Sequence, residues 1–256
     1  MILRRLGNKQ AIAKKILPYF PPHRIYIEPF FGAGGMFFNK PKAKYNIVND
    51  LDSDVFNLFQ VVMNQKEELF EMYKKIPYHS DLLNYWKEHK EVDKLLRAIR
   101  FIFISNFTLL GTGSHLSFGA RSFGKMNNSD FNALLDETLY LITDVQFLNC
   151  DFIKFFKSIQ IRSAHDNHFI YADPPYINTN DNYSNSFTPD DSIDLFNILQ
   201  ETGCKWAMSE FDNPFIIEQA NQRDLNIHII GERQNLNNRR TEILITNYQH
   251  QKTLFE

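Results

Sequence analysis

The segment His168-Phe-Ile-Tyr-Ala-Asp-Pro-Pro-Tyr176 joins a run of apolar residues to a turn with two consecutive prolines. The apolar part, Phe169–Ala172, predicts a buried strand. The strand must end at Pro174 because proline lacks the backbone N–H that a sheet ladder needs and has a fixed φ. Asp173, as the residue before a proline, is held extended. The sequence therefore predicts a rigid turn at the carboxyl end of a central strand.

Three groups on this turn suit an amino group attached to a flat heterocycle. The Asp173 carboxylate and the Pro174 carbonyl can each accept one N–H of an exocyclic amine, and the Tyr176 ring can stack on the heterocycle. Two acceptors would localise the nitrogen lone pair, and Asp173 would offset the charge that develops when the nitrogen attacks. The alternative is a rigid surface turn without chemistry.

Six other apolar runs share the composition of this strand, rich in β-branched and aromatic residues and bounded by Asn, Asp, Gly or Pro. They are Ile25–Ile27, Tyr45–Val48, Val145–Leu148, Trp206–Met208, Ile227–Ile230 and Glu242–Thr246. Segments whose apolar residues have helical spacing lie between most of these runs, as at Asp54–Asn64 and Thr188–Thr202. Thr188 is the expected N-cap of the second segment. This order predicts an α/β fold with a mainly parallel sheet and helices on both faces. The last two runs, joined by Gly231–Thr241 without a helical pattern, predict an antiparallel hairpin.

The middle of the chain has a different pattern. Residues 59–144 contain helical stretches and one polar loop, without the strand rhythm of the flanking regions. We therefore expect a discontinuous catalytic domain formed by residues 1–58 and 145–256. It is interrupted by an inserted, mainly helical subdomain at residues 59–144.

A glycine-rich turn follows the first predicted strand in Tyr26-Ile-Glu-Pro-Phe-Phe-Gly-Ala-Gly-Gly-Met-Phe-Phe38. Gly32 and Gly34 allow the backbone to approach a ligand closely. The turn has neither the spacing of a pyrophosphate loop nor that of a Walker loop, which favours a ligand without phosphates. Asp50, after the second strand, is placed to accept from ribose hydroxyls, as in dinucleotide folds. Together they predict a nucleoside-like cofactor, the alternatives being a tight strand–helix turn and a helix cap at Asp50.

Composition excludes several classes of protein. The chain has 256 residues, 43% of them apolar, and a net charge of −2. No apolar run reaches the roughly 18 residues of a membrane span, so we expect a soluble cytoplasmic protein without a membrane partner. Cys150 and Cys204 are too few for a disulfide framework or a zinc site, and the histidines lack metal-ligand spacing, so no metal is expected.

Basic residues are concentrated in two stretches without acidic residues, residues 1–15 and 94–125. Local basic patches are what binding to a phosphate backbone requires. The alternative is that they form solvated helix faces.

Taken in chain order, the motifs resemble those of Dam-type DNA adenine-N6 methyltransferases, the D12 class with α-group motif order. The matching segments are Leu6-Gly7-Asn8-Lys9, Phe30–Gly34, Asp50, Asn149-Cys150-Asp151-Phe152, Asp173–Tyr176 and Arg240–Asn247. Leu6 and Asn8 depart from the opening lysine motif of the family. The ordered set covers nearly the whole chain and implies the Rossmann-like sheet of S-adenosylmethionine-dependent methyltransferases.

The resemblance implies S-adenosylmethionine as the methyl donor and Asp173, Pro174 and Tyr176 as the catalytic residues. In this interpretation Lys9 and the glycine turn surround the methionine part of the donor, Asp50 binds its ribose, and Asp151 with Phe152 binds its adenine. The residues expected to bind the cofactor are Gly7, Lys9, Glu28, Pro29, Phe30, Gly32, Gly34, Asp50, Asp151, Phe152 and Asp173.

The resemblance also implies that the target adenine leaves the duplex, because base stacking denies access to its N6 atom. The polar loop Ile177–Ser186 suits a lid over a flipped base, with Phe187 as a further contact, and residues 59–144 become the target-recognition subdomain. The expected DNA contacts are Asn106, Arg121, Ser122, Lys125, Tyr183, Arg239 and Arg240. Leu110–Phe123 is only slightly similar to the recognition segment of GATC-specific members, so GATC is not assumed.

Other functions stay open at this point. An exocyclic amine also exists on cytosine, so N4-cytosine methylation is an alternative, as are an RNA adenine methyltransferase and a non-catalytic DNA-binding relative. RNA and protein-glutamine methyltransferases mostly have Asn in place of Asp173, and methylation of cytosine C5 needs a cysteine nucleophile beside a proline. The expected partner is double-stranded DNA, and a restriction endonuclease is left open as a second partner. The expected oligomeric state is a monomer or weak dimer.

Overall fold

The computed structural model describes residues 2–3, 8–117, 128–161, 165–177, 187–234 and 239–250. The chain divides into two compact units. The sheet unit comprises residues 10–31, 39–51 and 146–256. The helical unit comprises residues 1–9, 32–38 and 52–145. The chain therefore passes between the two units several times, and each unit is built from separate segments.

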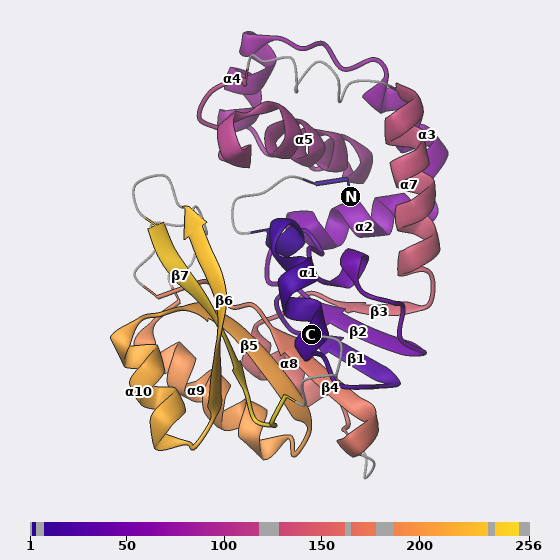
Figure 1. Ribbon diagram of the computed structural model, residues 1–256. Coiled ribbons are helices and arrows are strands. Elements are labelled where there is room, and N and C mark those ends of the chain that lie inside the picture. The colour runs from indigo at the N-terminus through magenta and orange to yellow at the C-terminus, as the bar shows by residue number, and fades with distance from the viewer. Residues whose placement is uncertain are drawn as a thin grey trace. The chain divides into compact units, whose positions relative to one another are not determined.

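One seven-stranded sheet carries the order β3-β2-β1-β4-β5-β7-β6 (Figure 1). Its strands are β1 (Ile25–Glu28), β2 (Tyr45–Asn49), β3 (Val145–Leu148), β4 (His168–Ala172), β5 (Lys205–Phe211), β6 (Asn226–Gln234) and β7 (Arg239–Thr246). Each of the seven apolar runs forms a strand, and the expected α/β fold with a mainly parallel sheet is confirmed.

Parallel pairing brings the carboxyl ends of the central strands to one edge of the sheet. β1 pairs with β2 on one side, with Ile27 opposite Ile47, and with β4 on the other, with Ile27 opposite Ile170. The strand order reverses between β1 and β4, because the chain runs outward through β2 and β3 and then returns to β4. Ligands of open α/β sheets bind outside the strand ends at such a switch point.

The last two strands form the expected antiparallel hairpin, but the pairing extends further than the apolar runs indicated. β6 and β7 remain in register as far as Gln234 and Arg239, through a bulge next to Gly231. Gly231 has a φ of 145°, a conformation that L side chains rarely adopt. Ladder hydrogen bonds continue through polar residues, so most of the segment predicted as a connection is strand.

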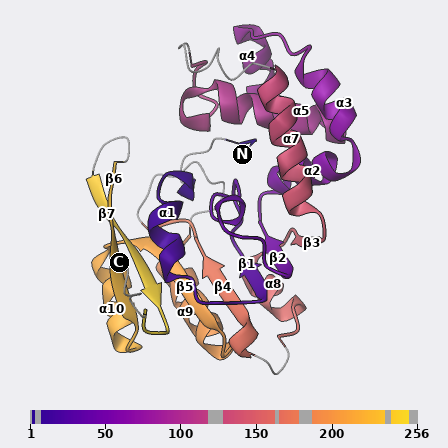
Figure 2. The same ribbon diagram turned by 45° about the vertical axis from the view of Figure 1, so that its right-hand side comes forward.

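Helices cover one face of the sheet with a continuous apolar core. α8 (Phe152–Ser158), α9 (Pro189–Glu201) and α10 (Pro214–Gln222) bury their apolar residues against β5 and β7, and α9 and α10 lie on the same side in both views (Figures 1 and 2). Thr188 forms the predicted cap of α9, within a reciprocal capping box with Asp191. On the other face, Phe20, which follows α1 (Ala13–Ile16), packs against two aromatic residues of β4. Its ring centroid lies 4.5 Å from that of Phe169 and 5.3 Å from that of Tyr171.

Among the described residues, five α-helices belong to the helical unit. They are α2 (Ser53–Asn64), α3 (Lys66–Tyr73), α4 (Ser80–Glu88), α5 (Lys94–Phe107) and α7 (Asn128–Ile142). Buried aromatic rings join them, with Tyr73 of α3 stacked on Phe131 of α7 at 3.7 Å between ring centroids. In the described part of the chain, no helix combines the length and apolar character needed to cross a bilayer.

Candidate active site

The Asp173–Tyr176 turn follows directly from the buried strand β4, as predicted. Asp173 is half-buried and Pro174 is buried. Tyr176 is only 8% exposed, and its hydroxyl donates a 2.5 Å hydrogen bond to Oε1 of Glu242 in β7. The Tyr176 ring also meets the edge of Phe211, with centroids 4.6 Å apart and planes at 80°. The turn is therefore fixed at its far end as well as at the strand.

Asn49 connects the strand ends around this turn, although it belongs to none of the motifs in the sequence. Its side-chain amide donates to the Pro29 carbonyl at 3.0 Å and to the Cys150 carbonyl at 2.9 Å. Its side-chain oxygen accepts from the Cys150 amide at 3.1 Å, and its backbone carbonyl accepts from Phe31. One buried asparagine thus joins the end of β2 to the segments that follow β1 and β3.

Asp50 and Asp151 stand at the ends of β2 and β3. Asp50 is not the cap of the next helix, because Asp52 accepts from the Asp54 amide and takes that role. The Asp50 amide donates to Leu148, and Asn149 donates to the Asp50 carbonyl at 2.7 Å. Asp151 caps α8 through the Ile153 amide, a role the sequence analysis did not assign to it.

Carboxyl groups at the strand ends lie close enough to affect one another. Burial raises the pKa of Glu28 well above its usual range. The charges of Asp173 and Asp50 act in the same direction, whereas a hydrogen bond from Tyr26 and the charge of Lys40 act against it. A group of acids that oppose each other's ionisation is a feature typical of functional sites.

Lys40 is a buried cation whose charge acts on one of these acids, Glu28. Its ammonium lies 4.0 Å from the centre of the Tyr26 ring and donates to Oδ1 of Asn46 at 3.1 Å. Burial lowers the pKa of Lys40 to about 8, although the charge of Glu28 partly offsets this. Lys40 lies only two residues after the glycine-turn segment that ends at Phe38, but it belongs to none of the recognised motifs.

Three aromatic rings gather next to the strand ends. Phe30, Phe152 and Phe187 lie with ring centroids 5.7 to 6.0 Å apart. Phe31 instead belongs to the core, where it packs edge-on against Phe147 at 4.9 Å. Aromatic faces and carboxylates are the groups that suit a sulfonium and a ribose, so the donor set of the sheet unit fits S-adenosylmethionine.

The glycine turn has the backbone that its sequence predicts. Gly32 and Gly34 have φ values of 55° and 74°, which side chains other than glycine adopt at a cost. A Cβ added to Gly32 would meet nothing within 4 Å, so the backbone there borders open space. Lys9 is buried in a short 3₁₀ helix, and Gly7 lies outside the described residues.

The structure locates only some of the expected DNA contacts. Asn106 donates its side-chain amide to the Ile2 carbonyl at 2.9 Å within the helical unit. Arg240 lies over the Phe211 ring at 5.6 Å, and Arg239 begins β7. Arg121, Ser122, Lys125 and Tyr183 lie outside the described residues, as does nearly all of the polar loop that follows Ile177.

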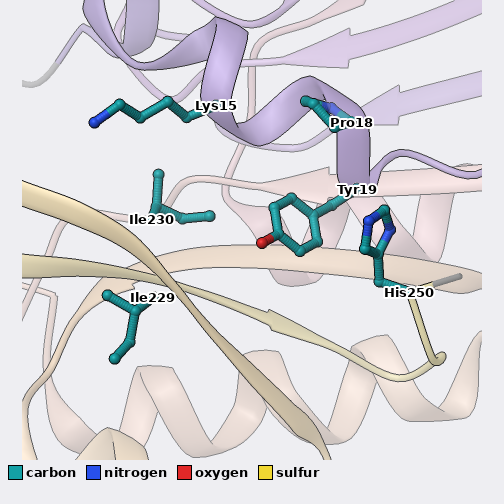
Figure 3. Close-up of a pocket in the computed structure, with 6 residues that line it drawn as sticks. All are labelled: Lys15, Pro18, Tyr19, Ile229, Ile230 and His250. Atoms are coloured by element: carbon teal, nitrogen blue, oxygen red, sulfur yellow. The ribbon is translucent and has the colours of Figure 1, made fainter. Parts of the chain in front are cut away.

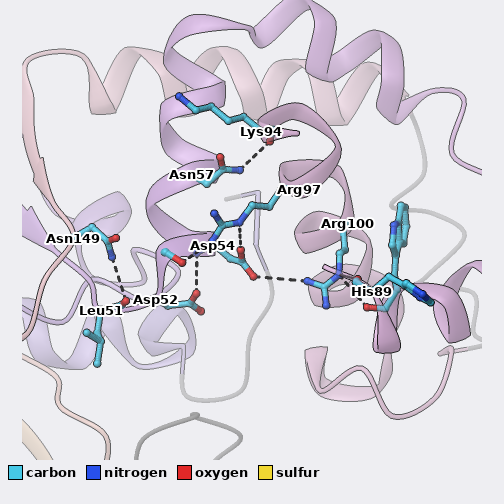
Figure 4. A network of polar contacts seen from close by, with 11 residues as sticks. Leu51, Asp52, Asp54, Asn57, His89, Lys94, Arg97, Arg100 and Asn149 are labelled. Atoms are coloured by element: carbon cyan, nitrogen blue, oxygen red, sulfur yellow. Dashed lines mark hydrogen bonds and ion pairs between the residues drawn. The ribbon is translucent and has the colours of Figure 1, made fainter. Parts of the chain in front are cut away.

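The basic stretch of α5 is partly used inside the helical unit. Arg97 and Arg100 both pair with Asp54 of α2, and Arg97 also donates to the Ser53 hydroxyl at 2.6 Å (Figure 4). Arg100 further donates to the Trp86 and His89 carbonyls. These two cations therefore connect helices, whereas the sequence pattern had suggested phosphate contacts.

Metal-binding clusters and reactive thiols are the groups that other reactions would need. None of the described residues form a group of three or more side chains that could hold a metal ion. Burial raises the pKa of the Cys150 and Cys204 thiols, which disfavours the thiolate that C5 methylation requires. A pocket of about 290 Å³ between the Lys15–Tyr19 region and β6 contains none of the predicted site residues (Figure 3).

Comparison with known proteins identifies the family. The model of the D12 class N6 adenine-specific DNA methyltransferases matches residues 6–236, which confirms the resemblance seen in the motifs. Type II methyltransferase M1.LlaDCHI of Lactococcus lactis subsp. cremoris is 25% identical, over 94% of this chain and 93% of its own.

Two further relatives match over part of their length. DNA adenine methylase of Haemophilus influenzae is 29% identical, over 68% of this chain and 63% of its own. Modification methylase StsI of Streptococcus sanguinis is 23% identical over 96% of this chain, which spans only 42% of that protein.

Proposed function

This chain belongs to the D12 class of N6 adenine-specific DNA methyltransferases, and from that premise we propose that it methylates adenine N6 at specific sites in double-stranded DNA. The reaction is that of EC 2.1.1.72. The observation that carries the proposal is the placement of the Asp173–Tyr176 turn at the carboxyl end of β4, beside the acids and aromatic rings that end β1, β2 and β3.

S-adenosylmethionine is the methyl donor, and it supplies an electrophilic methyl group on a sulfonium. Asp50 would accept hydrogen bonds from its ribose hydroxyls, and the Phe30 and Phe152 rings would contact its apolar and cationic parts. Glu28, Pro29, Asp151 and Asp173 complete the set proposed from the sheet unit. Gly7, Lys9, Gly32 and Gly34 are proposed on their motifs alone.

At the reacting centre, the chain's role is to hold the amine and stabilise the charge that forms. Asp173 and the Pro174 carbonyl would each accept one N–H of the adenine amine, which directs the nitrogen lone pair toward the methyl group. The nitrogen would form its bond to the methyl group as the methyl–sulfur bond of the donor breaks and leaves a neutral thioether. It would then release one proton to solvent, and the Asp173 carboxylate would stabilise the positive charge between these events. Tyr176 would contact the base.

The target base must leave the duplex for this geometry to form. We assign recognition to the inserted region 59–144 and catalysis to residues 1–58 and 145–256, with Asn106, Arg121, Ser122, Lys125, Tyr183, Arg239 and Arg240 as proposed DNA contacts. Relatives carry the names modification methylase, type II methyltransferase and DNA adenine methylase. Both a restriction-linked role and an independent one are therefore compatible with the family.

The test uses tritiated S-adenosylmethionine with unmethylated DNA and, separately, with RNA. The proposal predicts label in double-stranded DNA, little label in RNA, and heat of donor binding in calorimetry without DNA. Label confined to RNA would contradict the choice of substrate. Absence of donor binding would contradict the assigned site.

A further inference from the structure

The Asp173–Tyr176 turn is anchored by two different strands. At its start, Asp173 follows Ala172, a fully buried residue of β4. At its end, the Tyr176 hydroxyl donates to Glu242 of β7 at 2.5 Å. The two prolines between these anchors restrict the backbone, so fixing both ends fixes the Pro174 carbonyl as well.

Glu242 is placed to do this by the pairing of β5 and β7. It is 1% exposed and stands directly opposite Phe211, whose ring packs edge-on against Tyr176. One member of the pair thus supports the ring and the other binds its hydroxyl. A glutamate is costly to bury in a central strand unless it is hydrogen-bonded, which indicates a specific role.

The Tyr176 hydroxyl remains a donor over the physiological pH range. Burial raises its pKa well above the usual range, and the charges of Asp173 and Glu242 act in the same direction. The Tyr176 hydroxyl therefore keeps the proton that it donates to Glu242 at neutral pH.

Building on the proposed function, we propose that Glu242 is a positioning residue for methyl transfer. It holds Tyr176, and through the stiff turn it sets where the Asp173 carboxylate and the Pro174 carbonyl meet the amine. A displacement of about 1 Å in such a constellation can cost roughly 100-fold in rate. Among the residues proposed to bind the donor only Asp173 lies on this turn, so the effect falls mainly on turnover.

The first experiment compares Tyr176→Phe, Glu242→Ala and the double variant. Each single change should lower kcat by about 10- to 100-fold, with the Kd for S-adenosylmethionine within about twofold of wild type. The double variant should be no more than about threefold slower than the slower single variant, since both changes remove the same hydrogen bond. Losses that multiply would overturn the proposal.

Tyr171→Phe is the matched control. The Tyr171 hydroxyl forms a 2.7 Å hydrogen bond with Ser209, which is also buried and joins the neighbouring strands β4 and β5, but Tyr171 lies outside the turn. Its loss should lower thermal stability as much as Tyr176→Phe does and leave kcat within about threefold of wild type. An equal loss of kcat in Tyr171→Phe would mean that Glu242 acts only through stability.

Glu242→Gln keeps volume and an acceptor oxygen, so it tests the account even if Glu242→Ala does not fold. It should recover kcat to within about fivefold of wild type. A readout independent of activity is amide hydrogen exchange at Tyr176 and Ile177, which should accelerate in Tyr176→Phe and not in Tyr171→Phe. Unchanged exchange together with unchanged kcat in Tyr176→Phe would overturn the inference.

The two proposals fail in different ways. A wild-type protein that binds S-adenosylmethionine but labels no DNA contradicts the proposed function. An active wild type whose Tyr176→Phe and Glu242→Ala variants are equally active contradicts only the role of Glu242.

Discussion

Charged side chains gather both at the carboxyl edge of the sheet and between α2 and α5, but the two groups have different roles. At the sheet edge, Asp50 and Asp173 make ionisation of the buried Glu28 harder. Between α2 and α5, the carboxylate of Asp54 pairs with two guanidinium groups. The first arrangement keeps carboxyl groups together at the proposed site, whereas the second pairs opposite charges within the helical unit. Carboxyl groups that the fold holds close together therefore indicate the site better than basic residues that are clustered in the sequence.

The largest expected effect comes from the acid of the catalytic turn. Asp173→Ala should lower methyl transfer by about 10²- to 10⁴-fold, because the amine loses an acceptor and the developing charge loses its carboxylate. The measurement is incorporation of tritiated methyl groups into unmethylated DNA. Asp212→Ala, at an exposed position after β5, is the control and should retain activity. Full activity in Asp173→Ala would contradict a catalytic role for the acid at the carboxyl end of β4.

The next effect concerns the cofactor. Asp50→Ala should weaken S-adenosylmethionine binding by roughly 10- to 100-fold, because hydrogen bonds to a charged group contribute about 1.5–3 kcal/mol. Titration calorimetry without DNA measures this directly. Asp52→Asn, which retains the cap of α2, serves as the control. Equal donor affinity in Asp50→Ala and wild type would show that the acid of β2 lies outside the cofactor site.

Lys40 sharpens the comparison through pH. Its folded-state pKa of about 8 lies below that of an unfolded lysine, so the unfolded chain binds more protons between these values and stability rises with pH there. The free energy of unfolding of wild type should rise relative to Lys40→Met by on the order of 2 kcal/mol between about pH 7 and 9.5. Urea unfolding over this range measures it, with Lys42→Met as the control. Parallel pH profiles for wild type and Lys40→Met would contradict the buried position of this cation.

The smallest effect belongs to the helical unit. Asp54→Ala should lower the free energy of unfolding by about 1 kcal/mol, because two partly exposed arginines lose their carboxylate. The salt dependence of DNA binding should not change, since these cations are assigned to helix packing. Asp136→Ala, which removes the exposed pair with Lys66, should cost less. A steeper dependence of DNA affinity on salt concentration in Asp54→Ala would show that Arg97 and Arg100 contact phosphates.

Sequence reasoning was most successful where structure is determined locally. Pro174 and Pro175 end β4 by their own covalent geometry, and Thr188 and Asp191 form a capping box because they are three residues apart. The seven strands follow from their apolar runs. The lengths of β6 and β7 were underestimated, because backbone pairing carries both strands beyond their apolar residues.

Contacts between distant residues could not be predicted in the same way. Asn49 reaches the Cys150 region across 101 residues, Tyr176 reaches Glu242 across 66, and Arg97 reaches Asp54 across 43. Nothing in the composition of these segments specifies which partner each will meet. Glu242 did have two signals, as an acidic residue at the start of the apolar run Glu242–Thr246 and as part of the Arg240–Asn247 motif, but neither indicates its partner.

The most direct test of the central claim is the identity of the methylated nucleoside. Unmethylated double-stranded DNA is incubated with the protein and S-adenosylmethionine, digested to nucleosides and analysed by mass spectrometry. The account predicts N6-methyladenine, and its loss with Asp173→Ala. N4-methylcytosine or 5-methylcytosine as the product, or N6-methyladenine that persists in Asp173→Ala, would contradict it.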